Sequence, residues 1–454
     1  MGIQQATKII VIDDDPTGSQ TVHSCLLLTR WDPDTLLEGL RDAAPLFFVL
    51  SNTRGMDAGQ AAEVTREICV NLRVAIQRMQ EDGVEIRPVI VSRSDSTLRG
   101  HYPVETDVIA EELGPFDAHF LVPAFFEGGR ITRDGMHYLI VDGAPVPVHE
   151  TEFARDSVFG FSTAFLPDYV EEKTAGRIRS DQVQRFGLSD VRGDIAARLR
   201  GLQRNACCVV DAEQQPDLDS FARQVLAAAG EGKRFLFRSA ASLLTAFAAL
   251  PRQPVAAADM SRLVRDGRPG VVLVGSHVDK TSRQLQYLRD NSSIVPLHVD
   301  LDWMLRDEEG LFAEIVQQMA EAQHSGQGVA LYTSRGERGF ASTAERLAFG
   351  ERVSAFLMRL VRNMPRQTGF LISKGGITSN DTLSTGLALR TARVVGQIRA
   401  GCSVVLCPED HPRYPNLPVV IFPGNVGGDD ALAEAYRILS RRTATKAAAK
   451  TAVG

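Results

Sequence analysis

The sequence predicts an α/β protein with two α/β domains whose sheets are mainly parallel, and three observations lead to this fold class. Short apolar runs that end in small, polar or charged residues recur along the chain, which is typical of strands buried on both faces of a parallel sheet. Helical patterns lie between these runs: in residues 57–79, apolar side chains recur every three or four positions. The length of 454 residues is more than one ordinary core fills.

The first half of the chain contains several such runs, each followed by a polar cluster. The runs are 9–12, 46–50, 89–91, 120–122 and 208–210. Ligands of open α/β sheets bind beyond the carboxyl ends of the strands, where these clusters fall. We therefore expect a first domain over residues 1–250 with a binding site at that edge. Residues 150–187 fit the pattern poorly and are interpreted as an insertion.

A segment rich in proline and alanine, residues 251–258, interrupts the series and is the best candidate for a linker. The pattern then resumes with the apolar runs 271–274, 329–331, 370–372, 404–406 and 419–422. We predict a second α/β domain over residues 259–440. Residues 441–454 are small and basic without an apolar face, which indicates a flexible tail.

Composition narrows the class of protein. Lysine and arginine number 50 against 56 aspartates and glutamates, a net charge of −6, which argues against nucleic acid as a partner. No apolar run reaches the length of a membrane span and no hydrophobic signal segment opens the chain, so we expect a cytoplasmic protein with no membrane partner. The 6 cysteines are too sparse for a disulfide framework, which predicts buried, reduced thiols.

The first acidic cluster, Asp13-Asp14-Asp15-Pro16-Thr17, permits two interpretations. As D-x-D-x-T after a buried strand, it looks like the first motif of haloacid-dehalogenase-type phosphatases, in which one aspartate is the nucleophile and both bind magnesium. The alternative is a capped turn, in which the aspartates accept hydrogen bonds from backbone N–H groups. Adjacent carboxylates repel one another, so a cation beside them is expected in either case.

A second polar cluster, residues 94–101, combines a carboxylate, hydroxyl groups and a guanidinium at another strand end. Arg54 and Arg99 can form the planar two-point pairs that a carboxylate ligand requires, while Asp95 and the hydroxyls can hold a polyol. The alternative is a helix N-terminus capped by one of the polar residues at 94–96. Because Asp14 and Arg54 follow neighbouring predicted strands, a binding site is the favoured interpretation.

The second half carries glycine-rich strand exits that suit phosphate groups. Residues 275–281 are not a P-loop, because Asp279 stands where that motif needs glycine. The loops 373–380 and 423–428 are better candidates, since their paired glycines let backbone N–H groups approach an anion. Lys374 could add a charge there. Either loop alone is typical of a tight turn, but two in one domain favour nucleotide binding.

At these residues the chain resembles the four-carbon acid sugar kinases, which phosphorylate threonate, erythronate or 3-oxotetronate at the terminal hydroxyl with ATP. The resemblance spans about nine tenths of the chain in the expected order. It rests on Asp13-Asp14-x-x-Thr17-Gly18, Asn52-Thr53-Arg54, the stretch from Ser94 to Gly100, Gly275-Ser276, the stretch from Lys374 to Ser379, and the stretch from Pro423 to Gly428.

The resemblance implies a sugar-acid site in the first domain and an ATP site in the second. The implied substrate-binding residues are Asp14, Arg54, Ser94, Asp95, Ser96, Thr97 and Arg99. The implied nucleotide-binding residues are Ser276, Ser373, Lys374, Gly375, Gly376, Thr378, Gly424, Asn425, Val426 and Gly427. The lysine at 374 fits the threonate-type members better than the 3-oxotetronate-type members, so D-threonate is the expected substrate and D-erythronate the next.

The expected reaction is transfer of the γ-phosphoryl group of ATP to the 4-hydroxyl of the acid in the cleft between the two domains. Mg²⁺ would bridge the β- and γ-phosphates, with ligands that the sequence does not assign. Asp14 and Asp95 are both candidates for the group that accepts the hydroxyl proton. A 3-oxotetronate 4-kinase, a Mg²⁺-dependent phosphatase and a non-catalytic sugar-acid sensor remain alternatives, and a homo-oligomer is compatible with the sequence.

Overall fold

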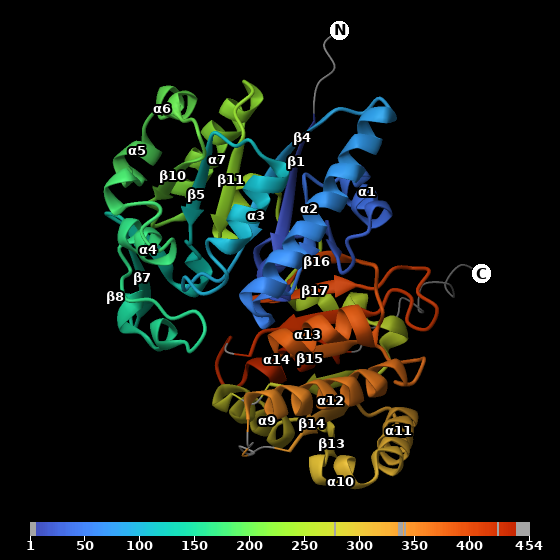
Figure 1. Cartoon of the computed structure of the whole chain (residues 1–454). Helices are drawn as coiled ribbons and strands as arrows, with labels where there is room; N and C mark the ends of the chain where they lie inside the picture. The colour runs from blue at the N-terminus through green and yellow to red at the C-terminus, as the bar shows by residue number, and fades with distance from the viewer. Residues whose placement is uncertain (1–5, 277, 335–338, 340–341, 425, 442–454) are drawn as a thin grey trace, which may run out of the picture. The chain divides into compact units, whose positions relative to one another are not determined.

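The computed structural model describes residues 6–276, 278–334, 339, 342–424 and 426–441. It confirms an α/β fold with mainly parallel sheets and two domains. One compact unit contains the residues up to 253 together with 390–394, and the other contains residues 254–389 and the chain from 395 onwards. Each unit is described below by itself (Figure 1).

The sheet of the first unit has the strand order β16-β2-β3-β1-β4-β11-β5-β10-β9. Its strands are β1 (Ala6–Asp13), β2 (Cys25–Leu28), β3 (Leu46–Leu50), β4 (Ile86–Arg93), β5 (Ala118–Val122), β9 (Gln184–Phe186), β10 (Ala206–Val210), β11 (Phe235–Ser239) and the first residues of β16 (Thr391–Arg399). The pairs described here are parallel except β16 with β2. The apolar runs predicted for this half all lie in strands of this sheet, whereas β2, β9, β11 and β16 were not among the predicted runs.

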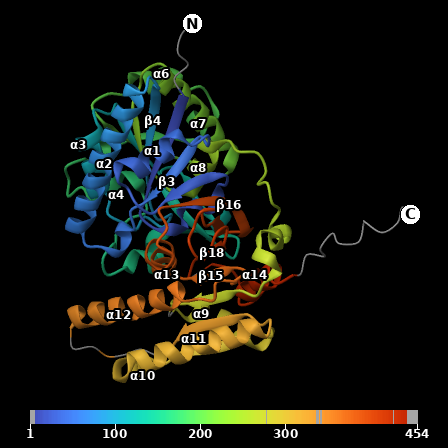
Figure 2. The same cartoon turned by 90° about the vertical axis from the view of Figure 1, so that its right-hand side faces the viewer.

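Helices cover both faces of this sheet. One group is α1 (Pro33–Arg41), α2 (Ala58–Glu81) and α3 (Val104–Leu113), and the other includes α7 (Gln215–Gly230) and α8 (Ala241–Ala248); Figure 2 shows the strands between them. Ile68, Leu72 and Met79 of α2 pack in one cluster with Ile10 of β1, as the helical spacing predicts. On the other face, Phe247 of α8 contacts an aromatic residue of β11. The two apolar faces explain why these strands read as continuous apolar runs.

The part of the chain between β5 and β10 adds a small separate sheet and short helices. Its strands are β6 (Arg130–Arg133), β7 (Met136–Val141) and β8 (Ala144–Pro147), and its helices are α4 (Leu166–Lys173), α5 (Leu188–Arg192) and α6 (Ala196–Gly201). Tyr169 of α4 and Phe161 belong to a buried cluster that also contains Leu98 and Tyr102. This segment therefore packs directly against the polar loop that follows β4.

The sheet of the second unit has the order β13-β14-β12-β15-β18-β17. Its strands are β12 (Val271–Val274), β13 (Val295–Val299), β14 (Val329–Thr333), β15 (Leu371–Lys374), β17 (Cys402–Leu406) and β18 (Pro418–Phe422). Its helices are α9 (Asp279–Asp290), α10 (Leu301–Arg306), α11 (Glu308–His324), α12 (Thr343–Arg362), α13 (Gly376–Asp381) and α14 (Ala431–Leu439). Strand β17 runs antiparallel to β18, while β12, β15 and β18 are parallel neighbours.

All 6 cysteines are buried and free, which confirms the prediction of buried thiols. Burial raises the pKa of Cys207 to about 12, so this thiol stays protonated at neutral pH. Among the described residues, none of the helices combines the length and the apolar composition that a membrane crossing needs.

Candidate functional site

The carboxyl ends of four neighbouring parallel strands of the first unit bring the predicted acid-binding residues together. These strands are β3, β1, β4 and β11, in that order across the sheet. Asp14 follows β1, Arg54 lies shortly after β3, and Ser94 follows β4. Polar side chains separated by many residues in the sequence therefore meet at one edge.

Asp14 and Arg54 form a two-point ion pair. Arg54 Nη2 lies 2.6 Å from Asp14 Oδ1, and Arg54 Nε lies 3.1 Å from Asp14 Oδ2. The Ser94 hydroxyl lies 3.1 Å from Asp14 Oδ2. Asp14 is 1 % exposed, and its burial raises its pKa although Arg54 opposes the shift. Burial and Arg54 thus shift the pKa of this carboxyl group in opposite directions, and burial has the larger effect.

The remaining aspartates of the first cluster also have assigned partners. Arg93 Nη1 donates to Asp13 Oδ1 at 3.2 Å, so guanidinium groups supply the cations expected beside this cluster. Burial raises the pKa of Asp13 to about 8. Asp15 accepts a hydrogen bond from the Thr17 backbone N–H (2.8 Å) and caps a short 3₁₀-helix. Asp13 is thus buried and Asp15 occupied as a cap, which leaves neither presented as the nucleophile of a phosphatase.

The loop after β4 is organised around Asp95. Its carboxylate accepts hydrogen bonds from the Thr97 hydroxyl and from Arg99 Nε (2.8 Å), and Arg54 Nη1 lies 3.7 Å away. Burial works to raise the pKa of Asp95, but Arg54 and Arg99 outweigh it and hold that pKa well below its usual range. Helix α3 begins at Val104, so the alternative in which the polar residues at 94–96 cap a helix is wrong. Asp95 is ionised and locked in place at neutral pH.

Arg99 is held by three groups. Besides Asp95, its guanidinium lies 3.5 Å from Asp156 Oδ2 and 4.9 Å from the centre of the Phe153 ring. Both partners belong to the segment interpreted as an insertion. Their contact with Arg99 ties that segment to the site, which the sequence did not predict.

A second layer of buried polar groups supports the loop. His137 Nε2 donates to the carbonyl of Ser96 at 2.7 Å, and its Nδ1 lies 2.9 Å from the Thr132 hydroxyl. Burial lowers the pKa of His137 to about 4, so the ring is neutral. Glu105, 2 % exposed, forms an ion pair with Arg238. Thr97 itself is 1 % exposed and Ser96 8 %, so these two predicted binding residues hold the loop from within.

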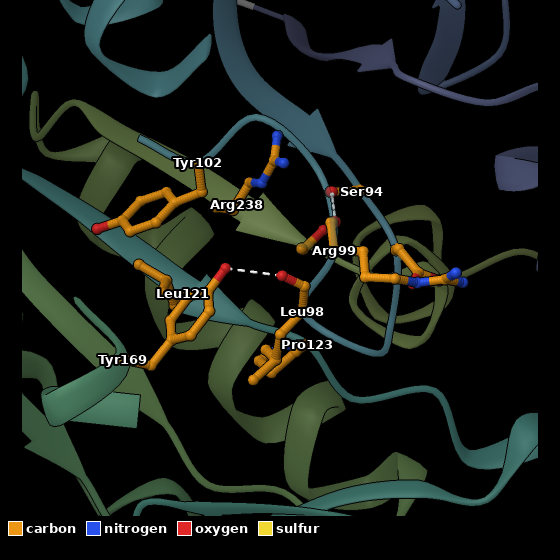
Figure 3. Close-up of a pocket in the computed structure, with 10 residues that line it drawn as sticks. Ser94, Leu98, Arg99, Tyr102, Leu121, Pro123, Tyr169 and Arg238 are labelled. Carbon is orange, nitrogen blue, oxygen red and sulfur yellow. Dashed lines mark hydrogen bonds and ion pairs between the residues drawn. The ribbon is translucent and has the colours of Figure 1, made fainter. Parts of the chain in front are cut away.

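A pocket lies beside this loop, with about 330 Å³ of space outside the protein atoms when the adjoining open solvent is included. Its lining residues are Ser94, Asp95, Leu98, Arg99, Tyr102, Leu121, Pro123, Tyr169, Arg238 and Ser239. Figure 3 shows Tyr102 and Tyr169 on one side and Ser94 and Arg99 on the other, with the Tyr169 hydroxyl donating to the Leu98 carbonyl at 2.7 Å. Among the predicted substrate-binding residues, Asp14, Arg54, Ser96 and Thr97 do not line it.

The sequence interpretation missed Tyr102, Tyr169, Arg238 and Ser239 in this pocket. A signal existed for two of them. The run Phe235-Leu236-Phe237 followed by Arg238-Ser239 has the pattern of an apolar strand that ends in polar residues. The two tyrosines carry no comparable local signal, because their place depends on packing between distant segments.

In the second unit, Ser276, Gly375 and Gly424 lie just after the ends of the neighbouring strands β12, β15 and β18. The Thr281 hydroxyl lies 2.9 Å from the Gly424 carbonyl and 3.2 Å from the Ser276 hydroxyl, which ties two of these exits together. Gly375 has φ = +124°, a conformation that favours glycine. Its N–H donates to the Phe422 carbonyl at 2.8 Å and is therefore already used.

The loops that follow β12, β15 and β18 lie too close together for larger residues to replace their glycines. A Cβ atom on Gly275 would lie 2.2 Å from the Thr378 hydroxyl, and one on Gly424 would lie 3.0 Å from the Ser276 hydroxyl. Gly376 and Thr378 are partly exposed at the start of α13. Backbone and small hydroxyl side chains thus line this edge, a composition that fits phosphate groups.

Ser373 and Lys374 lie beneath the loops. Both are fully buried. Ser373 Oγ lies 3.1 Å from the Thr382 hydroxyl, and the Lys374 ammonium donates to the carbonyls of Pro423 and Gly424 (3.1 Å for the second). Burial lowers the pKa of Lys374 to about 7. The lysine therefore holds the start of the loop after β18 through its hydrogen bonds to these two carbonyls.

The loop after β18 is also held at its far end. Gln284 of α9 donates to the carbonyls of Val426 (2.9 Å) and Gly428 (2.8 Å), and Gly427 has φ = +81°. Asn425, the remaining predicted nucleotide-binding residue, lies outside the described residues. Within the part of the chain that the structure describes, no group of three or more histidine, cysteine or acidic side chains is arranged to hold a metal ion.

The fold and the two strand edges define a class: a two-domain α/β protein with charged and hydroxyl side chains at one edge and glycine-rich loops at the other. Comparison with protein families identifies the family within this class. Residues 9–247 match the model of a sugar-binding N-terminal domain, and residues 271–432 match that of a nucleotide-binding C-terminal domain. The chain belongs to the four-carbon acid sugar kinase family.

Two curated relatives agree with this assignment. A D-erythronate kinase of Heliobacterium modesticaldum is 29% identical over 224 residues, covering 48% of this chain and 47% of the relative. A D-threonate kinase of Bordetella bronchiseptica is 28% identical over 166 residues, covering 35% of this chain and 37% of the relative. The matched parts thus span less than half of either relative.

Solved structures show the same fold over almost the whole chain. A Salmonella typhimurium LT2 protein provisionally described as a tRNA synthase has a TM-score of 0.68 at 18% identity and covers 95% of this chain and 99% of its own. A Haemophilus influenzae protein has a TM-score of 0.62 at 17% identity, with coverage of 95% and 100%. At these identities the likeness shows the fold alone.

Proposed function

We propose that the chain is an ATP-dependent kinase that phosphorylates the 4-hydroxyl of a four-carbon sugar acid in carbohydrate acid catabolism, acting in the cytoplasm, which supplies ATP. D-Threonate is the first expected acceptor and D-erythronate the second. The observation that carries the proposal is the pairing of a sugar-binding and a nucleotide-binding family domain in one chain. The names of the two curated relatives support the substrate class.

The acid would bind in the pocket beside the loop after β4. Arg99 and Arg238 both line this pocket, and guanidinium groups are suited to bind the carboxylate end of an acid. Arg54 would act indirectly, through the ion pairs that hold Asp14 and Asp95 in place. This differs from the expectation that Arg54 itself anchors the acid.

Asp95 is better placed than Asp14 to contact the attacking hydroxyl, but its lowered pKa makes it a weak proton acceptor, so its proposed role is to orient that hydroxyl. It lines the pocket with its side chain 14% exposed, whereas Asp14 is 1% exposed and turned to Arg54. A carboxylate held in the ionised form can orient the attacking hydroxyl by accepting its hydrogen bond. Phosphoryl transfer depends mainly on such positioning and on neutralising charge.

The nucleotide would bind at the loops that begin with Ser276, Gly375 and Gly424. The close approach of these loops and their lack of side chains suit the phosphate groups of ATP. Mg²⁺, when bound, would neutralise charge on the β- and γ-phosphates; we assign it no protein ligand. In the proposed reaction the acid held in one domain receives the phosphoryl group of the nucleotide held in the other.

A panel assay tests the proposal. The purified protein is incubated with ATP, Mg²⁺ and one of D-threonate, D-erythronate, L-threonate or 3-oxotetronate, and ADP release is followed. We expect substrate-dependent ADP with D-threonate. Failure of every acid to release ADP would exclude the kinase, while preference for 3-oxotetronate would replace the proposed substrate. Phosphate release from phosphorylated sugars without ATP would instead indicate a phosphatase, and acid binding without turnover would indicate a sensor.

A further inference from the structure

Ser239 is the last residue of β11, next to the loop that carries Asp95. In the sheet register it lies opposite Arg93 of β4 and Val122 of β5. Its carbonyl accepts a hydrogen bond from the Ser94 N–H at 2.9 Å, which fixes the backbone here. The side chain is 3% exposed, and its Oγ has no hydrogen-bond partner within the described part of the chain.

Nearby buried serines differ from Ser239 in this respect. Ser92 Oγ accepts a hydrogen bond from Arg238 Nη1 at 2.7 Å, and Ser242 Oγ accepts one from the Phe126 N–H at 3.0 Å. The Ser94 hydroxyl lies within hydrogen-bond distance of Asp14 and of the Arg99 carbonyl. A buried hydroxyl without a partner lowers stability, so its presence calls for a reason outside the folded chain's own contacts.

The position of Ser239 supplies that reason, because it lines the pocket beside the loop after β4. Leu121 and Pro123 give this pocket an apolar wall, and Arg99 and Arg238, each in an ion pair with a carboxylate, also line it (Figure 3). Small-molecule sites are mostly apolar, with a few polar groups that fix the ligand's orientation.

We propose that the Ser239 hydroxyl binds a hydroxyl group on the carbon chain of the acceptor and so helps to select polyhydroxy acids. The inference rests on the proposed function and adds a specificity-determining residue to it. A serine hydroxyl both donates and accepts, which matches another hydroxyl, whereas the guanidinium groups of Arg99 and Arg238 match the carboxylate. A site that hydrogen-bonds a substrate hydroxyl rejects the analogue that lacks it.

The variant Ser239→Ala tests this with two measurements: the stability of the protein should not fall, whereas its affinity for the acid should. The melting temperature should stay the same or rise, because an unpartnered buried hydroxyl is removed. The KM for the acid should rise about three- to tenfold, the size of one lost hydrogen bond, while the KM for ATP stays unchanged. Ser242→Ala is the matched control: it should lower the melting temperature, since the Phe126 N–H loses its acceptor, and leave the KM for the acid unchanged.

Deoxy analogues identify the hydroxyl concerned. Wild-type protein should discriminate against both 2,4-dihydroxybutanoate and 3,4-dihydroxybutanoate, and Ser239→Ala should lose about three- to tenfold of the discrimination against one of them only. An unchanged KM and unchanged discrimination would overturn the inference and assign Ser239 Oγ to a buried water molecule. A marked fall in the melting temperature would overturn it too, by showing a structural partner.

The outcome can be separated from that of the proposed function. If wild-type protein phosphorylates an acid but Ser239→Ala does so with the same KM, the kinase stands and the role of Ser239 fails. If no acid is phosphorylated, calorimetric titration of both proteins with D-threonate decides: tighter binding to wild type supports the role of Ser239, and equal or absent binding overturns it.

Discussion

The strand ends at which we propose that the acid and the nucleotide bind are built from different parts of the polypeptide in the two units. In the first unit, side chains dominate: Asp14, Arg54 and Asp95 form a network of ion pairs at the strand ends. In the second unit, glycine and small hydroxyl residues line the corresponding strand ends. A sugar acid differs from its relatives by the direction of single hydroxyls, which side chains can distinguish. Phosphate groups are common to all nucleotides, and backbone N–H groups suffice for them.

The two edges also treat buried charge differently. Each buried carboxylate of the first edge faces a guanidinium, as Asp13 faces Arg93 and Glu105 faces Arg238. The buried ammonium of Lys374 in the second edge faces backbone carbonyls instead. Burial lowers the pKa of Lys374, which faces carbonyls, and it raises the pKa of Asp13 to about 8 even with Arg93 beside it. The two edges should therefore respond differently to substitution and to pH.

Removal of Arg54 should have the largest effect. Arg54→Ala leaves Asp14 buried without its two-point partner, and breaking a buried ion pair in this way costs about 3–5 kcal/mol of unfolding free energy. We also expect the KM for the acid to rise roughly 10- to 100-fold and the KM for ATP to change little, because Asp95 loses a neighbour that fixes it. Urea unfolding and steady-state kinetics measure the two effects.

Two further variants test how the effect of Arg54→Ala arises. Arg54→Lys keeps the charge but cannot make two parallel hydrogen bonds, so it should restore only part of the loss. Arg66→Ala is the control, because Arg66 is an exposed arginine whose ion pairs with Glu111 and Glu112 should contribute far less to stability than the pair of Arg54 with Asp14. A larger effect on the KM for ATP than on that for the acid would mean that the first edge does not bind the acid.

The pH dependence of stability should separate the two edges. The pKa of Asp13 is about 8 in the folded protein, above its unfolded value, so its contribution to stability falls as pH rises from about 4 to 8. The pKa of Lys374 is about 7, below its unfolded value, so stability rises from about pH 7 to 10.5 as the ammonium is lost. One pKa unit corresponds to about 1.4 kcal/mol, so each slope amounts to a few kcal/mol.

Denaturant unfolding at a series of pH values measures these slopes. Asp13→Asn should flatten the dependence between about pH 4 and 8, and Lys374→Met should flatten it between about pH 7 and 10.5. Each variant serves as the control for the other. If Lys374→Met left the alkaline slope intact, the difference in buried charge between the edges would lose its support.

The two edges also differ in how far the sequence predicted them. Asp14, Arg54 and Asp95 follow or lie near the ends of apolar runs, and parallel pairing brings such ends together, so their meeting was predictable. Tyr169 was not, because it reaches the loop from α4, far along the chain. In the second unit, the sequence predicted the glycine-rich loops but not the burial of Lys374. A lysine at the end of an apolar run is equally compatible with a charge on the surface.

The smallest of these effects concerns the loop after β15. Gly375→Ala forces a side chain into φ = +124° and within 3.1 Å of the Thr378 hydroxyl, a strain of about 1–3 kcal/mol. The displaced loop should raise the KM for ATP about tenfold and leave the KM for the acid unchanged, the reverse of the pattern expected for Arg54→Ala. Gly350→Ala is the matched control: it lies inside α12 with open space around it, and should leave both KM values unchanged while stabilising the helix by about 0.5–1 kcal/mol. If Gly375→Ala left the KM for ATP unchanged despite a measurable loss of stability, the loop would be a tight turn and the nucleotide would have to be placed elsewhere in the second unit.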